Sequence, residues 1–191
     1  MSFIYIITHP EVVVDPHVPV IEWSVSEQGR KRTSAMLQQP WVKTLDLVYS
    51  SEERKAYQTA EIIANTLEIP LHTHSKLGEV NRSSTGFLEE SELNKTVHEF
   101  FSHPDKSIAG WEMANIAQER IVHTFSAIVQ SHPEKTLGIV THGMVSALLI
   151  SYHKKVPIHQ RYMQKQLGSY FIFDTVEQTI IQEWRSINDH F

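Results

Sequence analysis

Two apolar runs, each followed directly by threonine and then histidine, constrain the fold of this chain more than any other feature. Residues 3–7 lead to His9, and residues 137–140 lead to His142. Runs of this kind are typical of strands buried on both faces of a parallel sheet. Sites in open α/β sheets lie at the carboxyl ends of the strands. If the two strands are neighbours, His9 and His142 face one crevice.

The rest of the chain alternates between strand and helix patterns. We predict further strands at residues 45–49, 71–74, 169–173 and 179–184, and helices at about 26–39, 52–67, 88–101, 111–130 and 143–150. This order predicts one domain over residues 1–191, a three-layer α/β sandwich with a largely parallel central sheet. The last two strands are expected to form a hairpin at the sheet edge.

Two local predictions concern segments next to the expected crevice. Prolines exclude a helix from residues 11–20, so we expect an extended, partly buried loop beside the site. Ser50 and Glu53 have the spacing of a capping box, which would begin the helix at about residue 52.

Composition limits the classes of function. The 191 residues include no cysteine, which excludes disulfides, thiolate zinc sites and a cysteine nucleophile. There is no apolar stretch of about 18 residues and no signal-peptide pattern, so we predict a cytoplasmic protein without a membrane partner. The net charge of −5 argues against nucleic acid as a partner. The edge hairpin leaves room for a homodimer.

The two histidines favour phosphate chemistry. A neutral imidazole is a competent nucleophile near pH 7. His142 also lies at the start of a predicted helix, whose N–H groups and dipole favour an anion. A metal site would need Asp15 or His17 as further ligands, and we predict neither metal nor cofactor. The expected ligand is a small phosphorylated substrate or another anion.

Four segments in order resemble the histidine phosphatase (phosphoglycerate mutase-like) superfamily. They are the strand that leads to His9, the motif from Ser50-Ser51 through Lys55-Ala56 and Gln58-Thr59-Ala60-Glu61, the pair Leu77 and Glu79, and Thr141-His142-Gly143. The segment from Val25 to Gly29 is also similar to the family's Leu-Thr-x-x-Gly helix start. The likeness extends from residue 3 to about residue 175.

The resemblance implies a phosphatase that acts on a small phosphomonoester. His9 would become a phosphohistidine, Glu79 would act as general acid and then general base, and His142 would stabilise the transferred group. The positions that match the family's phosphate pocket are Thr8, Lys55 and Gly143. Mutase activity is a weaker interpretation, because the chain lacks the inserted segments of the long mutases.

The chain departs from the family pattern at both phosphate-pocket arginines. Thr8-His9-Pro10 replaces Arg-His-Gly, and Lys55 replaces the arginine of the helix motif. Each lost charge-assisted contact is worth about 1.5–3 kcal/mol. Arg82 is our candidate for a relocated guanidinium, since Arg54 should point away from its neighbour Lys55. The alternative function is a catalytically impaired relative that binds a phosphorylated or acidic ligand, or a protein partner.

Overall fold

The computed structural model describes residues 2–188, and within them the chain forms one six-stranded sheet with the order β3-β2-β4-β1-β5-β6. The strands are β1 (Phe3–Thr8), β2 (Leu47–Ser50), β3 (Leu71–Thr73), β4 (Leu137–Thr141), β5 (Ser169–Asp174) and β6 (Thr179–Ser186). The pairs β1–β4, β4–β2 and β2–β3 are parallel, whereas β5 runs antiparallel to β1 and β6 antiparallel to β5. The predicted, largely parallel sheet with an edge hairpin is confirmed.

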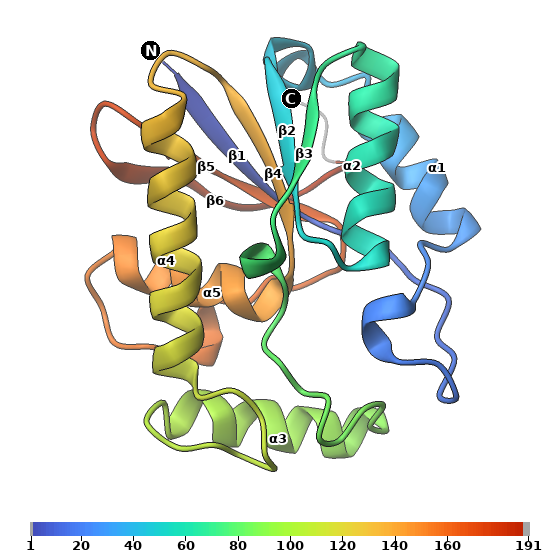
Figure 1. Ribbon diagram of the computed structural model, residues 1–191, viewed down its shortest axis with the longest axis vertical. Helices are drawn as coiled ribbons and strands as arrows, with labels where there is room; N and C mark the ends of the chain where they lie inside the picture. Colours follow the sequence, from blue (N-terminus) through green and yellow to red (C-terminus); the bar gives the residue numbers. More distant parts are fainter. Residues whose placement is uncertain (1, 189–191) are drawn as a thin grey trace.

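Helices cover both faces of the sheet. They are α1 (Glu27–Met36), α2 (Arg54–Leu67), α3 (Glu90–Ser102), α4 (Ala114–Ser131) and α5 (Gly143–His153), with short 3₁₀ turns η1 (Val20–Glu22), η2 (Pro40–Thr44), η3 (Ser75–Leu77) and η4 (Gln160–Tyr162). In Figure 1, α1 and α2 lie on one side of the sheet, α4 and α5 lie on the other, and α3 lies beyond the carboxyl ends of the parallel strands. The chain therefore has the predicted three-layer α/β architecture.

Strand β1 is central because both of its faces are buried. Ile4 and Ile6 pack in the core that includes α4 and α5, whereas Tyr5 and Ile7 pack in the core that includes α1 and α2. All four side chains are at most 6% exposed. Alternate residues of a strand point to opposite faces, so an uninterrupted apolar run is what a central strand between two helical layers requires.

Several predicted boundaries were wrong. Helix α4 begins at Ala114 rather than at residue 111. The predicted capping box does not form, because Ser50 is still part of β2 and its hydroxyl donates to the Ser51 carbonyl. Helix α2 instead begins at Arg54, with the Ser51 hydroxyl accepting from the Glu53 N–H.

The loop over residues 11–20 is extended only in part. Val12 bridges to Val25, and the Val13 N–H donates to the Ser24 carbonyl. Val13 and Val14 are 56% and 54% exposed, so the expected partial burial does not hold for them.

Within residues 2–188, no helix has the length and apolar character needed to cross a membrane.

Candidate active site

His9 and His142 lie side by side at the carboxyl ends of adjacent strands. The parallel register of β1 and β4 pairs Thr8 with Thr141, so the residues that follow both strands leave the sheet together. The two imidazole centroids are 5.3 Å apart with the rings inclined at 64°. His9 is 9% exposed and His142 is fully buried. Two residues 133 positions apart in the sequence thus lie next to each other, both buried, at the carboxyl ends of two central strands.

The backbone fixes the tautomer of His9. Its Nδ1 lies 2.9 Å from the Pro10 carbonyl oxygen, which can only accept, so Nδ1 carries the proton and Nε2 keeps its lone pair. Burial, with smaller effects from His142 and Lys55, lowers the pKa of His9 to about 3; the Pro10 carbonyl and Glu53 act in the opposite direction. His9 is therefore neutral near pH 7, the state that a nucleophilic imidazole needs.

His142 has one ring nitrogen engaged and one without a partner. Its Nε2 lies 2.9 Å from the Ser51 hydroxyl and 3.4 Å from Glu53 Oε1. Its buried Nδ1 meets no hydrogen-bonding group among the described residues. Burial holds the pKa of His142 well below its usual value, and the charges of Lys55, Arg120 and Arg82 lower it further. An unpaired buried polar atom is costly, and at a site it is suited to pairing with a ligand.

Glu79 caps the helix that was expected to meet the ligand. Its carboxylate accepts from the Met144 and Val145 N–H groups at the start of α5, each at 3.1 Å, and from the Val80 N–H at 3.0 Å. Burial raises the pKa of Glu79, as does the negative charge of Glu53, while these N–H groups lower it. The first N–H groups of α5 are therefore engaged by the protein's own Glu79 carboxyl group.

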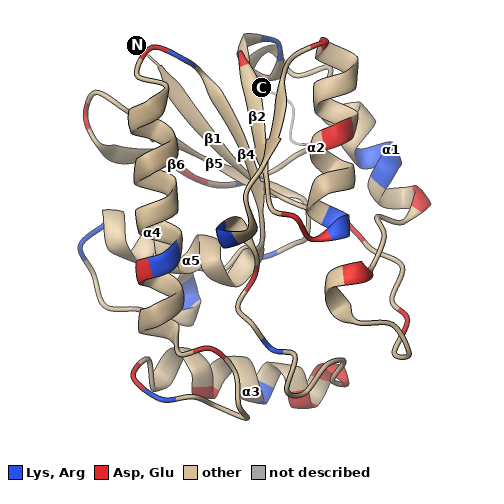
Figure 2. Ribbon diagram, in the orientation of Figure 1, with Lys and Arg blue, Asp and Glu red and all other residues tan. Residues whose placement is uncertain are grey.

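Lys55 is buried and already paired. Its Nζ lies 2.5 Å from Glu53 Oε2 and donates to the Val20 carbonyl at 2.9 Å. Glu53 Oε1 accepts from the Glu79 N–H at 2.7 Å. Figure 2 shows acidic and basic residues adjoining at the start of α2. Glu53 is a site residue that sequence reasoning assigned to a cap; its only signal was its position two residues before the basic residue of the motif.

The remaining predicted phosphate-binding residues differ in their surroundings. The Thr8 hydroxyl donates to Gln164 Oε1 and accepts from the Ser169 N–H at 3.0 Å, so it is engaged with β5 and the segment before it. A Cβ on Gly143 would lie 3.1 Å from Gln164 Nε2, so this amide lies against Gly143. Gln164 had no sequence signal. The Arg82 guanidinium lies 6.0 Å from the centre of the Trp111 ring, and its charge acts on His142.

Arg120 of α4 holds the Glu79 loop and was not anticipated. Its guanidinium makes two bonds to Glu112, at 2.9 and 2.8 Å. The same group donates to the carbonyls of Lys76, Gly78 and Glu79 at 2.8, 3.0 and 3.2 Å. One partly buried cation thus connects α4, Glu112 in the segment before α4, and the turn that carries Glu79.

The loop before α1 contacts both Lys55 and the loop that follows Glu79. The Lys55 amine binds the carbonyl of Val20 in the loop before α1, and in the same loop Trp23 lies 6.1 Å from Phe87, measured between ring centroids. Phe87 belongs to the loop that follows Glu79. The Trp23–Phe87 contact therefore joins the loop before α1 to the loop that follows Glu79.

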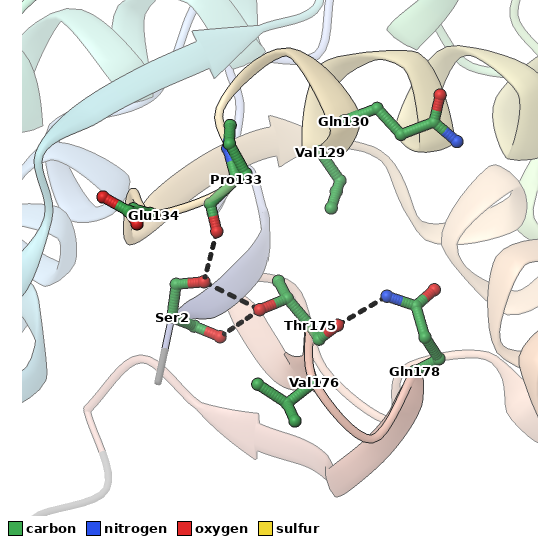
Figure 3. Close-up of a pocket in the computed structure, with 8 residues that line it drawn as sticks. All are labelled: Ser2, Val129, Gln130, Pro133, Glu134, Thr175, Val176 and Gln178. Atoms are coloured by element: carbon green, nitrogen blue, oxygen red, sulfur yellow. Dashed lines mark hydrogen bonds between the residues drawn. The ribbon is translucent and has the colours of Figure 1, made fainter.

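A surface pocket lies at the other end of the sheet and is not part of this site. Figure 3 shows its lining residues, which are Ser2, Val129, Gln130, Pro133, Glu134, Thr175, Val176 and Gln178. Ser2 precedes β1, whereas His9 follows it.

Over residues 2–188, no three His, Asp or Glu side chains are grouped so as to hold a metal ion.

Comparison with known proteins assigns this chain to a protein family. A family model described as the histidine phosphatase superfamily (branch 1) matches residues 20–188. The match begins after β1 and so does not include His9. A search of curated proteins gave no match.

Solved structures with the same fold cover nearly the whole chain. YhfR from Bacillus stearothermophilus has a TM-score of 0.76 and 22% identity, over 95% of both chains. The mycobacterial glucosyl-3-phosphoglycerate phosphatase, solved with inorganic phosphate, has a TM-score of 0.77 and 18% identity, over 99% of this chain and 100% of its own. Phosphoserine phosphatase from Entamoeba histolytica, solved with 3-phosphoglyceric acid, has a TM-score of 0.77 and 17% identity, over 97% and 98%. The fold is thus phosphoglycerate mutase-like, and the family match over most of the sequence makes this chain a member of the histidine phosphatase superfamily.

Proposed function

We propose that the protein is a phosphatase that hydrolyses a small phosphomonoester through a phosphohistidine on His9. The observation that carries this proposal is the hydrogen bond from His9 Nδ1 to the Pro10 carbonyl. It leaves the Nε2 lone pair of a neutral imidazole available next to His142, whose ring centroid is 5.3 Å away. Membership of the superfamily supports the same chemistry.

In the first step, His9 Nε2 attacks phosphorus and the bond to the ester oxygen breaks. Glu79, whose pKa is raised by burial, gives its proton to the leaving oxygen. His142 Nδ1, which has no partner in the described part of the chain, is the group we assign to a phosphoryl oxygen. In the second step water attacks phosphorus, the N–P bond breaks, and Glu79 takes the proton from water.

A second candidate is a non-catalytic relative that binds a phosphorylated or acidic ligand. The charge of Lys55 is balanced by Glu53, and the Thr8 hydroxyl is engaged by Gln164. Both positions where the family pattern has arginine therefore offer less to a phosphoryl group than a free guanidinium would. This arrangement favours weak transition-state stabilisation, which would leave binding without turnover.

Hydrolysis of p-nitrophenyl phosphate separates the two candidates. The wild-type protein should turn over, the His9→Ala variant should not, and His17→Ala, which changes an exposed histidine nearby, should behave as wild type. Labelling with a ³²P-phosphomonoester, quenched in alkaline detergent, should give an alkali-stable, acid-labile phosphoprotein that is absent in His9→Ala. Equal background rates in wild type and His9→Ala, with phosphate still raising the melting temperature, would favour the binding protein.

A further inference from the structure

The Ser51 hydroxyl lies between His142 and the backbone that leads into α2. It accepts from the Glu53 N–H at 3.1 Å, and its oxygen lies 2.9 Å from His142 Nε2. Ser51 and His142 are both fully buried. Within residues 2–188 the hydroxyl makes only these two hydrogen bonds. The direction of the bond between Ser51 and His142 can therefore be worked out by counting protons.

A serine hydroxyl has one proton to donate, and its bond with the Glu53 N–H uses only its oxygen. If His142 Nε2 also donated to Ser51, the hydroxyl proton would be buried without an acceptor. The His142 Nδ1 lone pair would likewise lack a donor among the described residues. If Ser51 donates to Nε2 instead, only the proton on His142 Nδ1 remains to be paired. Buried polar groups are rarely left without partners, so the second arrangement is favoured.

The Glu53 carboxylate is a poor alternative acceptor for a proton on His142 Nε2. Its Oε1 lies 3.4 Å from that nitrogen, beyond the usual N–H···O range of about 2.7–3.2 Å. The same oxygen already accepts from the Glu79 N–H at 2.7 Å, and Oε2 is paired with Lys55. Ser51 is therefore the group that decides which ring nitrogen of His142 carries the proton.

We propose that Ser51 is a positioning residue that keeps the His142 proton on Nδ1 and so makes this ring a hydrogen-bond donor to a phosphoryl oxygen. Burial keeps the pKa of His142 low, so the ring is neutral and has a single proton. In a neutral imidazole, the hydrogen bond at one nitrogen decides whether the other is protonated. The inference rests on the proposed function, which assigns Nδ1 to the phosphoryl oxygen. With the proton on Nε2, Nδ1 would present a lone pair to an oxygen that also only accepts.

The two neighbouring imidazoles then have opposite roles. His9 donates through Nδ1 to the Pro10 carbonyl and keeps its lone pair on Nε2, where it can attack phosphorus. His142 accepts from Ser51 at Nε2 and keeps its proton on Nδ1. A nucleophile and a hydrogen-bond donor thus arise from two neutral rings, at a site where the charge of Lys55 is already balanced by Glu53.

Nitrogen-15 NMR of the wild-type protein tests the tautomer directly, because protonated and unprotonated ring nitrogens resonate far apart. The two His142 signals are assigned by their loss in His142→Asn. At about pH 7, Nδ1 should give the signal of a protonated nitrogen and Nε2 that of an unprotonated one. The opposite pattern, or a proton on both nitrogens, would overturn the proposal. This measurement does not depend on whether a Ser51 variant folds.

Ser51→Ala removes the donor to His142 Nε2, so the proton should move to that nitrogen and leave Nδ1. The affinity for inorganic phosphate, measured by titration calorimetry, and kcat/KM for p-nitrophenyl phosphate should both fall by about ten- to a hundredfold, the worth of one charge-assisted hydrogen bond. In a His142→Asn background, Ser51→Ala should have little further effect on phosphate affinity, because no imidazole proton remains to be placed.

Ser50→Ala is the matched control. Ser50 is also fully buried, and its hydroxyl donates to the Ser51 carbonyl rather than to His142. Ser50→Ala therefore loses one buried hydrogen bond without changing the partner of His142 Nε2, and it should bind phosphate and turn over like the wild type.

The outcomes separate this proposal from the proposed function. An unprotonated Nδ1 of His142 in the wild type would overturn the role of Ser51, as would equal phosphate affinity and turnover in Ser51→Ala and Ser50→Ala. In either case, p-nitrophenyl phosphate turnover that depends on His9 would leave the proposed phosphatase intact. A wild type that neither binds phosphate nor turns over the ester would overturn both.

Discussion

Replacing Arg120 by methionine removes the guanidinium that ties α4 to the turn carrying Glu79. Methionine keeps most of the aliphatic volume but none of the five hydrogen bonds to Glu112 and to the three carbonyls of the turn. The Glu112 carboxylate, whose side chain is 14% exposed, would then be left without its cation.

The cost follows from this geometry. Removing one partner of a buried ion pair destabilises a protein by about 3–5 kcal/mol, because the other charge stays buried. Arg120 and Glu112 are 19% and 14% exposed, so some solvent reaches the pair and the lower end applies. We expect Arg120→Met to lower the free energy of unfolding by about 3 kcal/mol.

Urea unfolding followed by circular dichroism gives this free energy directly. Arg54→Met is the matched control, since Arg54 is exposed at the start of α2 and its loss should cost under about 0.5 kcal/mol. Adding Glu112→Gln to Arg120→Met should recover part of the loss, because it removes the unpaired charge. A loss under about 1 kcal/mol in Arg120→Met would refute the reasoning.

Three further predictions concern acid sensitivity, packing and pH. Burial lowers the pKa of His153 from 6.5 to about 4. The neutral His153 therefore contributes fully to stability above pH 6.5, and this contribution disappears as the pH falls toward 4. In urea unfolding, His153→Phe should lose less stability than the wild type over that pH range. Gly29→Ala should cost about 3 kcal/mol, since the new Cβ would lie 2.4 Å from the Glu11 carbonyl oxygen, whereas Ser34→Ala on the exposed side of α1 should be near neutral by thermal unfolding. The pKa of His9 is about 3, so kcat/KM for p-nitrophenyl phosphate should show no decline centred near pH 6.5 as the pH is lowered. A decline centred there would contradict a buried neutral His9.

The sheet could be predicted from the sequence because its central strands are buried on both faces. The apolar run from Phe3 to Ile7 supplies both cores, and a run of this kind has few interpretations other than a central strand. The helix limits were less predictable. Ser50 and Glu53 have capping-box spacing, but the pairing of β2 with β4 continues through Ser50, and that pairing is invisible to a local pattern.

The position of the histidine pair could be predicted from the strand ends in the sequence, whereas the charged residues around the pair could not. Glu53 meets a residue 26 positions away, and Thr8 meets Gln164 across 156 positions. Contacts of that range depend on which turns approach one another in the folded chain. Nothing in the local sequence distinguishes an acidic residue that starts a helix from one that neutralises a buried lysine.

The place of β1 in the sheet has a consequence for how the molecule forms. This strand is synthesised before the other strands of the sheet, yet both of its neighbours, β4 and β5, lie in the last third of the sequence. Its edges therefore stay open until residues near 137 and then 169 have been synthesised, and such long-range pairing slows folding. During that interval the apolar strand β1 has no partner and is exposed to aggregation, so the incomplete chain is expected to need chaperones.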